Sequence, residues 1–192
     1  MPVPIDIQHT ELEGVLEICP KIFSDARGFF TETYNRDTWV AKGFIEEFVQ
    51  DNLSLSKKGT LRGMHYQINP RGMGKLVRAV QGAVYDVAVD LRKDSPTFGK
   101  WLGRELSSEN HLMLWVPVGF AHGFVALEDN TLVYYKCTGT HSPEHERAVA
   151  YNDPEIGIQW PIEPTIVTDK DAQAPTLSDA DFNFACQGAA RG

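Results

Sequence analysis

The sequence predicts an all-β domain, a closed sandwich or barrel with a few short peripheral helices. Three observations predict it. Short apolar runs that alternate with period two recur along the chain, which is typical of strands. The 16 Gly and 11 Pro residues separate these runs as turns do. Helical signals are few, and many short strands joined by Gly/Pro turns favour a sandwich or a barrel.

The clearest strand lies between Ala83 and Leu91, where Tyr85, Val87 and Val89 share one face and Asp86 lies on the other. Its residues Val84, Tyr85, Val87 and Val89 are aromatic or β-branched, as strands prefer. Further strands are expected at 28–34, 48–56, 61–67, 75–80, 101–106, 112–116, 123–127 and 132–138.

Two short helical segments are expected outside the strands. One runs from Asp37 to Lys42, with Asp37 as its N-cap and Gly43 ending it. The other is a turn at Asp169–Ala172.

The length and the net charge of the chain limit the number of domains and the kinds of partner that it can have. Its 192 residues predict one domain over residues 1–180, with a flexible tail at 181–192 that ends in small residues. The net charge of −8 argues against a nucleic-acid partner and against an anionic membrane surface, because both favour basic proteins.

The sequence also predicts a cytoplasmic location. Met1–Thr10 has neither the basic region nor the apolar region of a secretory signal. The apolar stretch Leu112–Leu127 is too short to cross a membrane and is better explained by buried strands around a turn. Cys19, Cys137 and Cys186 are widely spaced, so free buried thiols are expected.

The charges are distributed unevenly. The stretch Asn52–Tyr85 contains no Asp or Glu, although the chain holds 26 acidic residues. Its cations are Lys57, Lys58, Arg62, Arg71, Lys75 and Arg78. We expect Lys57 and Lys58 to be solvated. Arg62 and Lys75 lie within apolar strand runs, where an uncompensated charge is costly, and they therefore predict an anion-binding site.

Two histidines occupy positions that suggest chemistry without a metal. His122 lies in the pattern Pro-x-Gly-x-x-His, which recurs in cupin barrels. His65 stands where metal-binding cupins have a His-x-His pair, but here the second histidine is Gln67. Two histidines without a nearby carboxylate rarely hold a transition metal, so both are predicted to be free for acid–base work.

The spacing of Arg62 and His65 predicts an irregular strand. Residues three apart on a regular strand face opposite sides, so both reach one ligand only if the strand bulges or ends between them. Gly63 is the residue that permits a bulge. Gln50 and Asn52 are two apart and share a face directly.

These residues fall into blocks that recur in one order in a known family. The blocks are DARGFFTE at 25–32, QDN at 50–52, GTLRGMHYQ at 59–67, GKLVR at 74–78, DVAVD at 86–90, SPTFG at 95–99, GFAHGF at 119–124, YK at 135–136, NDP at 152–154 and DKD at 169–171. Over Asp25 to Pro175 the chain closely resembles the dTDP-4-dehydrorhamnose 3,5-epimerases.

The resemblance implies a fold and a reaction. The fold is a cupin jelly-roll barrel, and the protein is a homodimer that needs no cofactor and no metal. The substrate is a small nucleotide sugar, a dTDP-linked 4-keto-6-deoxy sugar, inverted at C3 and C5. The implied pathways are the biosynthesis of dTDP-rhamnose and of polysaccharides.

The resemblance also implies residue roles. His65 removes the proton beside the ketone and Asp171 pairs with it, Lys75 faces the C4 oxygen, and Tyr135 is the acid on the opposite side of the sugar. Arg62 contacts phosphate or sugar, with Gln50 and Asn52 nearby. Residues implied to surround the ligand further out are Arg27, Phe30 and Glu32 of the partner subunit, together with His122 and Asp86.

Elementary chemistry supports these roles independently. Removing a proton next to a ketone leaves charge on the ketone oxygen, and Lys75 in a buried position stabilises that enolate. A base that works near neutrality suits His65, and a carboxylate such as Asp171 orients it and raises its basicity. A tyrosine hydroxyl can deliver a proton to the opposite face.

The chain departs from the family pattern at one loop. Thr140-His141-Ser142-Pro143 stands where many relatives have Tyr-Tyr-x-Pro. The change affects contacts on one side of the sugar, unless it is a neutral loop change. The alternative that this loop suggests is a one-carbon epimerase or a keto-isomerase on a related sugar. Two further alternatives are a non-catalytic cupin that binds nucleotide sugars, which would more naturally lack His65, Tyr135 or Asp171, and a metal-dependent cupin oxygenase, which Gln67 disfavours.

Overall fold

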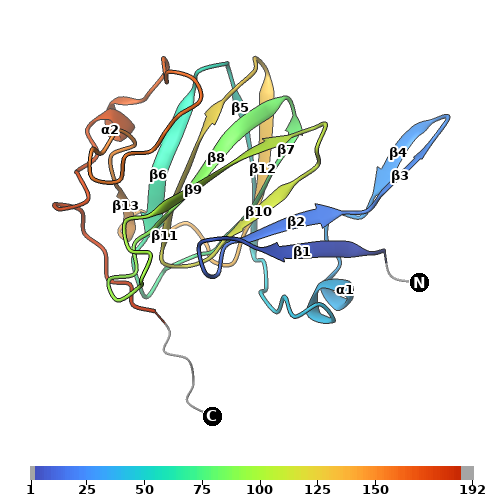
Figure 1. Ribbon diagram of the computed structural model, residues 1–192, viewed down its shortest axis with the longest axis horizontal. Coiled ribbons are helices and arrows are strands. Elements are labelled where there is room, and N and C mark those ends of the chain that lie inside the picture. Colours follow the sequence, from blue (N-terminus) through green and yellow to red (C-terminus); the bar gives the residue numbers. More distant parts are fainter. Residues whose placement is uncertain (1–2, 187–192) are drawn as a thin grey trace, which may run out of the picture.

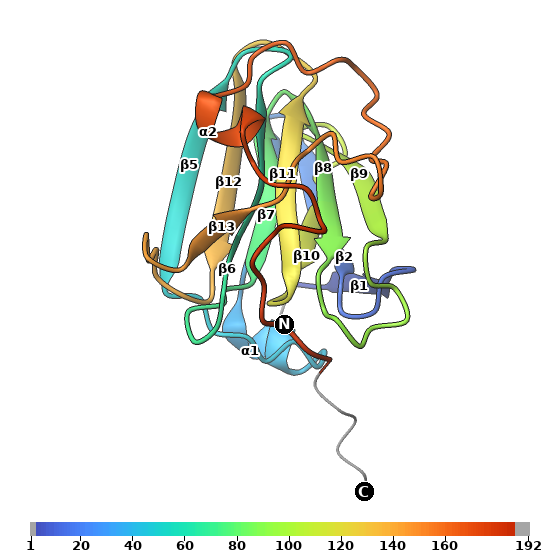
Figure 2. The same cartoon turned by 90° about the vertical axis from the view of Figure 1, so that its left-hand side faces the viewer.

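The computed structural model describes residues 3–186 and confirms the all-β prediction. A six-stranded sheet in the order β1-β2-β10-β7-β12-β5 faces a five-stranded sheet in the order β13-β6-β11-β8-β9 (Figure 1, Figure 2). All strand pairs within them are antiparallel, and the two sheets form a cupin-like jelly roll.

The strands are β1 Ile5–His9, β2 Leu16–Pro20, β3 Ile22–Asp25, β4 Gly28–Thr31, β5 Gln50–Ser56, β6 Leu61–Gln67, β7 Lys75–Gln81, β8 Ala83–Asp90, β9 Trp101–Ser107, β10 Met113–Val116, β11 Phe120–Ala126, β12 Thr131–Cys137 and β13 Glu146–Ala148. The helices are α1 Arg36–Val40 and α2 Asp169–Ala172. The run predicted at Leu112–Leu127 is therefore β10 and β11 around a turn, as expected. No helix within residues 3–186 is long and apolar enough to span a membrane.

The main core lies between the two sheets. Val77, Leu114 and Val133 of the six-stranded sheet pack against Val84 and Leu106 of the five-stranded sheet. Because alternate residues of a strand face opposite sides, each sheet also has an outer apolar face that needs cover.

Different segments cover the two outer faces. The segment that follows β13 lies over the five-stranded sheet, where Ile156, Leu177 and Phe184 pack on Val87 and its neighbours. Phe184 belongs to the stretch predicted to be a tail, and it is only 3% exposed. The rest of that stretch, residues 187–192, lies outside the described residues.

Helix α1 and the loop after it cover part of the six-stranded sheet, where Trp39 and Phe44 pack against Trp115. The helix begins one residue earlier than predicted, at Arg36. Its N-cap is Asn35, whose side-chain oxygen accepts hydrogen bonds from the backbone of Asp37 and Thr38, so the assignment of Asp37 as the cap was wrong.

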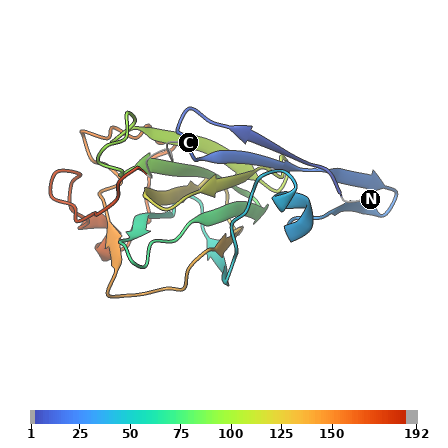
Figure 3. The ribbon, with the colours of Figure 1, turned by 90° about the horizontal axis from the view of Figure 1, so that it is seen from below.

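A two-stranded hairpin of β3 and β4 projects from the body of the molecule (Figure 1, Figure 3). Phe23, Phe29 and Phe30 on it are 46%, 58% and 64% exposed. Aromatic side chains exposed on a projecting element are unusual unless a further surface covers them.

All three cysteines are free, as predicted. Cys137 is buried, but Cys19 is exposed, so the expectation that all three are buried was wrong. Cys19 lies on β2, next to the edge strand of its sheet, and its side chain points away from the core.

Candidate active site

A bulge in β6 brings Arg62 and His65 to the same cavity. His65 lies opposite His122 of β11, and Arg62 lies opposite Phe124. Three steps along β6 therefore match two steps along β11, which is the extra residue of a β-bulge. Gly63 lies in the bulge with φ +142°, a conformation that glycine adopts readily. The predicted irregularity at Gly63 is confirmed.

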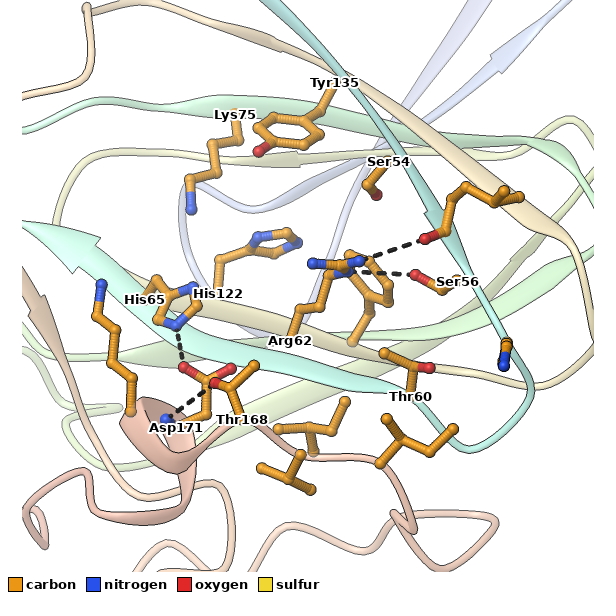
Figure 4. Close-up of a pocket in the computed structure, with 17 residues that line it drawn as sticks. Ser54, Ser56, Thr60, Arg62, His65, Lys75, His122, Tyr135, Thr168 and Asp171 are labelled. Carbon is orange, nitrogen blue, oxygen red and sulfur yellow. Dashed lines mark hydrogen bonds and ion pairs between the residues drawn. The ribbon is translucent and has the colours of Figure 1, made fainter.

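A cavity of about 610 Å³ opens between the sheets at this bulge (Figure 4). Six of the predicted site residues line it, namely Arg62, His65, Lys75, His122, Tyr135 and Asp171. They come from β6, β7, β11, β12 and α2, so the fold brings together residues that are far apart in the sequence.

His65 and Asp171 form a hydrogen-bonded pair. The distance from His65 Nε2 to Asp171 Oδ1 is 2.6 Å, and the Asp171 side chain is 5% exposed. Burial alone would raise the pKa of Asp171, but hydrogen bonds from His65 and from the backbone N–H of Gly63 lower it overall. The ionised carboxylate therefore fixes the ring, and it leaves Nδ1 of His65 as the nitrogen that can accept a proton.

The segment that contains Ile166, Thr168 and α2 covers the cavity next to β6, and it positions Asp171. Thr60 forms a parallel bridge with Ile166, and Leu61 donates its backbone N–H to the Ile166 carbonyl at 2.9 Å. Thr168 then caps α2, whose third residue is Asp171. Asp171 thus reaches His65 from the segment that closes the cavity.

A second histidine–carboxylate pair lies deeper. His122 Nε2 is 2.9 Å and 3.0 Å from the two carboxylate oxygens of Asp86, and both residues are buried. Burial lowers the pKa of His122, and Asp86 opposes this shift. The sequence placed Asp86 in the lining; instead its carboxylate is fully buried behind His122, which it orients.

Lys75 and Tyr135 lie on the other side of the cavity from His65 and Asp171 (Figure 4). Burial lowers the pKa of Lys75, although Cys137 and other nearby acids oppose the shift. Burial raises the pKa of Tyr135, so its hydroxyl keeps its proton at neutral pH. A cation and a proton donor therefore face an imidazole base across one space.

An adjoining cavity of about 350 Å³ shares His65, Lys75 and Tyr135 with the first. Gln50 and Asn52 line it, as predicted from their common face, and Gln50 Nε2 donates to Asn52 Oδ1 at 3.2 Å. Its remaining lining is Tyr66, Gln67, Met73, Cys137, His141 and Glu146. The loop residue that departs from the family pattern, His141, thus lies at the site.

Sequence reasoning missed several lining residues, among them Ser54, Ser56, Thr60, Thr168 and Lys170. A signal existed for the two serines, because they continue the face of β5 on which Gln50 and Asn52 lie. Thr60 and Lys170 lie within blocks shared with the family, at 59–67 and 169–171, and no local pattern marks Thr168.

The hairpin residues do not reach either cavity within this chain. Arg27 and Phe30 line a separate hollow on the hairpin itself, and Arg27 pairs with Asp25. Glu32 lies just beyond β4, where its side chain accepts a hydrogen bond from Asn35. Their predicted role at a partner's site stays a prediction.

The charged groups of the cavity are already arranged in pairs. Among residues 3–186, no group of three or more His, Cys, Asp and Glu side chains is placed to hold a metal ion. The arrangement supplies a base, an acid and a cation around a space that admits a small molecule. This is the set required to remove a proton next to a carbonyl group and return one from the other face.

Comparisons with known proteins agree with this chemistry. The family model described as dTDP-4-dehydrorhamnose 3,5-epimerase matches residues 9–179. The chain is 49% identical to the dTDP-4-dehydrorhamnose 3,5-epimerase of Shigella flexneri, over 93% of this chain and 99% of that protein.

Solved structures show the same fold. The dTDP-6-deoxy-D-glucose-3,5-epimerase of Legionella pneumophila in complex with dTDP-4-keto-L-rhamnose superposes with a TM-score of 0.88, at 44% identity over 93% of this chain and 95% of that one. A 3'-monoepimerase of Streptomyces bikiniensis superposes with a TM-score of 0.82, at 35% identity over 88% and 86%. The matched length and identity show that this chain belongs to the dTDP-4-dehydrorhamnose 3,5-epimerase family, a family of isomerases.

Proposed function

We propose that the chain epimerises C3 and C5 of a dTDP-linked 4-keto-6-deoxy sugar. The observation that carries the proposal is the placement of the His65–Asp171 pair and of Tyr135 on opposite sides of one cavity, with Lys75 beside Tyr135 (Figure 4). Epimerisation needs a base on one face of the sugar and an acid on the other.

Each inversion is a pair of proton transfers. Nδ1 of His65 takes the proton from the carbon beside the C4 ketone, and the electron pair of the broken C–H bond moves to the ketone oxygen. The Lys75 ammonium stabilises the enolate oxygen that forms. Tyr135 then protonates the same carbon from the other face, and the ketone is restored. His65 releases its proton to solvent and Tyr135 takes one from solvent, which resets both groups for the second carbon. Because no electrons are gained or lost overall, the scheme requires no redox cofactor.

Solvent exchange tests this scheme. The protein is incubated with dTDP-4-keto-6-deoxy-glucose in deuterated water, and C3 and C5 are followed by NMR. Deuterium at both carbons is expected. His65→Ala is expected to abolish exchange, whereas His9→Ala on an exposed edge strand is expected to keep the parental rate. Parental exchange in His65→Ala contradicts the role of the base.

A second candidate function is inversion at one carbon, and the position of His141 favours it. His141 lies in the lining of the adjoining cavity, where its backbone N–H donates to Gln50 Oε1 at 2.9 Å. A different side chain at this position changes the contacts on one side of the sugar and could limit the enzyme to one carbon. Deuterium at C3 alone in the same experiment supports this candidate and excludes the double epimerase.

We further infer that two copies of the chain form a homodimer through the outer face of the six-stranded sheet. Leu53 and Leu55 of the edge strand β5 are 62% and 59% exposed, and Val80 is 41% exposed. On the same face Arg78 is buried, and its Nε has no hydrogen-bond partner within residues 3–186. A buried cation without a partner is costly, so a second copy that supplies acceptors accounts for it.

The projecting β3–β4 hairpin supports the same inference. Phe29 contacts His111 of its own chain, with the ring centroids 4.8 Å apart, but Phe23 and Phe30 remain exposed. In a dimer these side chains and Arg27 supply the outer part of the partner's ligand site. Leu53→Asp combined with Leu55→Asp is expected to yield monomers in light scattering, whereas Val118→Asp, exposed on the turn between β10 and β11, leaves the dimer intact. A monomeric parent contradicts the inference.

We propose a cytoplasmic location for this reaction. The support is that all three cysteines are free, which suits a reducing compartment. Fractionation of cells that express the protein tests the proposal, and recovery from the periplasm or the medium contradicts it.

A further inference from the structure

Gln67 lines the adjoining cavity, but the hydrogen bonds of its side chain go to the protein backbone. The residue is 5% exposed. Its Nε2 donates to the Arg71 carbonyl at 2.7 Å and to the Thr140 carbonyl at 3.3 Å, and its Oε1 accepts from the Ser142 N–H at 2.7 Å. Both N–H groups of the amide are therefore used, so Gln67 has no donor left for a ligand.

These hydrogen bonds join two loops. Residues 68–74 connect β6 to β7, residues 138–145 connect β12 to β13, and both loops lie at the same end of the two sheets (Figure 2). The loops also pack closely, because a Cβ added to Gly139 would lie 3.1 Å from the Met73 Cβ. Gln67 thus fastens the loop at 138–145 both to β6 and to its neighbouring loop.

The backbone of residue 141 is held from a second side as well. The His141 N–H donates to Gln50 Oε1 at 2.9 Å, while Gln67 holds the carbonyl of Thr140 and the N–H of Ser142. Three consecutive residues are therefore fixed by side chains of β5 and β6. The side chain of His141 is presented to the adjoining cavity from this fixed backbone.

Strand β6 connects this arrangement to the base. His65 and Gln67 are two residues apart on β6, so they share a face and lie about 7 Å apart along the strand. The position of the His141 side chain relative to the imidazole of His65 is thus set through a short path, which runs from β6 through the amide of Gln67 to the loop.

We propose that Gln67 is a positioning residue, which fixes residue 141 relative to His65 and so sets the contact of the His141 side chain with the sugar part of the ligand. The inference rests on the proposed function, which places the sugar beside His65, Lys75 and Tyr135, and both cavities share these three residues. Gln67 itself acts through the loop and not on the ligand.

Calorimetric binding of two nucleotides tests Gln67. One probe is dTDP-glucose, which carries a sugar without a ketone and therefore binds without turnover, and the other is dTDP, which has no sugar. Gln67→Met keeps the length of the side chain but removes its amide. The Kd for dTDP-glucose is expected to rise about three- to tenfold, because the loop must then be ordered on binding, and the Kd for dTDP is expected to stay within about twofold.

Gln81→Met is the matched control. Gln81 Nε2 also donates to a loop carbonyl, that of Asn130 at 3.0 Å, but Gln81 lies at the opposite end of β7 from Lys75. This variant loses the same kind of hydrogen bond away from the cavities. It is expected to keep the parental Kd for both nucleotides.

A double-mutant cycle separates positioning from direct contact. His141→Ala keeps the loop backbone and removes the imidazole, and alone it is expected to raise the Kd for dTDP-glucose by a similar factor. If Gln67 acts through residue 141, adding Gln67→Met to His141→Ala changes the Kd little, whereas a direct contact of Gln67 with the ligand gives two factors that multiply.

The outcomes separate this inference from the proposed function. A parental Kd for dTDP-glucose in Gln67→Met overturns the inference, and so do an equal loss for dTDP or two factors that multiply in the cycle. An unfolding midpoint shows whether Gln67→Met is folded, and a parental Kd in His141→Ala overturns the inference even if it is not. A parent that binds dTDP-glucose but shows no solvent exchange from its keto sugar contradicts the proposed function and leaves the role of Gln67 intact.

Discussion

Gly63→Ala is the sharpest test of the way in which this fold builds its site. An added Cβ at Gly63 would lie 2.5 Å from the Gly123 Cα and 3.1 Å from the His122 carbonyl oxygen. Both are backbone atoms of the neighbouring strand, so no flexible side chain can move aside. The residue also has φ +142°, which L-residues rarely adopt.

The two costs add. An unfavourable positive φ costs about 1–2 kcal/mol, and overpacking in a dense interior costs about 1–3 kcal/mol. The free energy of unfolding is therefore expected to fall by roughly 2–5 kcal/mol, a large share of the roughly 5–15 kcal/mol typical of a domain. Urea denaturation followed by circular dichroism measures it.

Gly157→Ala is the matched control. Gly157 also has a positive φ of +65°, but the nearest atom to an added Cβ is 3.8 Å away, in ordinary contact. It isolates the backbone cost, so a loss of about 1–2 kcal/mol is expected. The difference between the two variants is the steric cost of the close approach of β6 and β11.

The same variant tests the site. If β6 relaxes into a regular strand, Arg62 and His65 no longer face one cavity, and a displacement of about 1 Å can lower kcat/KM about 100-fold. Gly157→Ala is expected to keep the parental kcat/KM. The reasoning is refuted if Gly63→Ala matches Gly157→Ala in stability and keeps the parental rate.

Three further predictions concern charged groups. Burial lowers the pKa of Lys75, so kcat/KM is expected to fall on the alkaline side at a pH below the ordinary lysine value of 10.5. Lys75→Arg is expected to move this fall to higher pH and to lower the maximal kcat/KM. A pH–rate profile of both proteins measures the two effects. Burial alone would raise the pKa of Asp90, but hydrogen bonds from Arg92 and neighbours lower it, so its stabilisation is complete above the unfolded pKa and is lost as pH falls through the folded pKa. Asp90→Ala is expected to cost about 3–5 kcal/mol at neutral pH and to flatten the acid side of the stability curve in urea titrations at several pH values. Asp86→Asn keeps a hydrogen-bonding partner for His122 but removes the negative charge of residue 86. The free energy of unfolding is therefore expected to change by less than about 1 kcal/mol, whereas kcat/KM is expected to fall. Urea denaturation measures the first quantity and steady-state kinetics the second.

The sequence predicted the central strands because their short apolar runs are rich in β-branched and aromatic residues, as in β8 and β12. The strands it missed are β1, β2, β3 and β13, which are short or lie near an edge. β1, for example, buries only Ile5, so its sequence carries little alternation. The cap of α1 was misplaced by two residues because Asn35 and Asp37 are both good caps, and only the backbone shows which one starts the helix.

The sequence predicted which residue types form the site more fully than it predicted how those residues are arranged. The bulge between Arg62 and His65 follows from their spacing and from Gly63 alone. The pairing of His65 with Asp171 spans a sequence separation of 106 residues, and only the resemblance to a family suggested it. The burial of Asp86 behind His122 depends on how β8 and β11 pack side by side. The alternation within one strand shows which face a residue lies on, but it does not show how deeply the side chain is buried.

Asp171, which orients the base His65, belongs to the segment that covers the cavity and not to the strands that form its sides. This covering segment is held by the Thr60–Ile166 bridge and by the hydrogen bonds that the Gly59 carbonyl accepts from the backbone of Thr165 and Ile166. Release of the whole segment 165–171, including the Lys170–Glu146 ion pair, would remove Asp171 from the imidazole. Activity thus depends on the attachment of one short covering segment, and heating is expected to abolish activity before the sheets beneath it unfold.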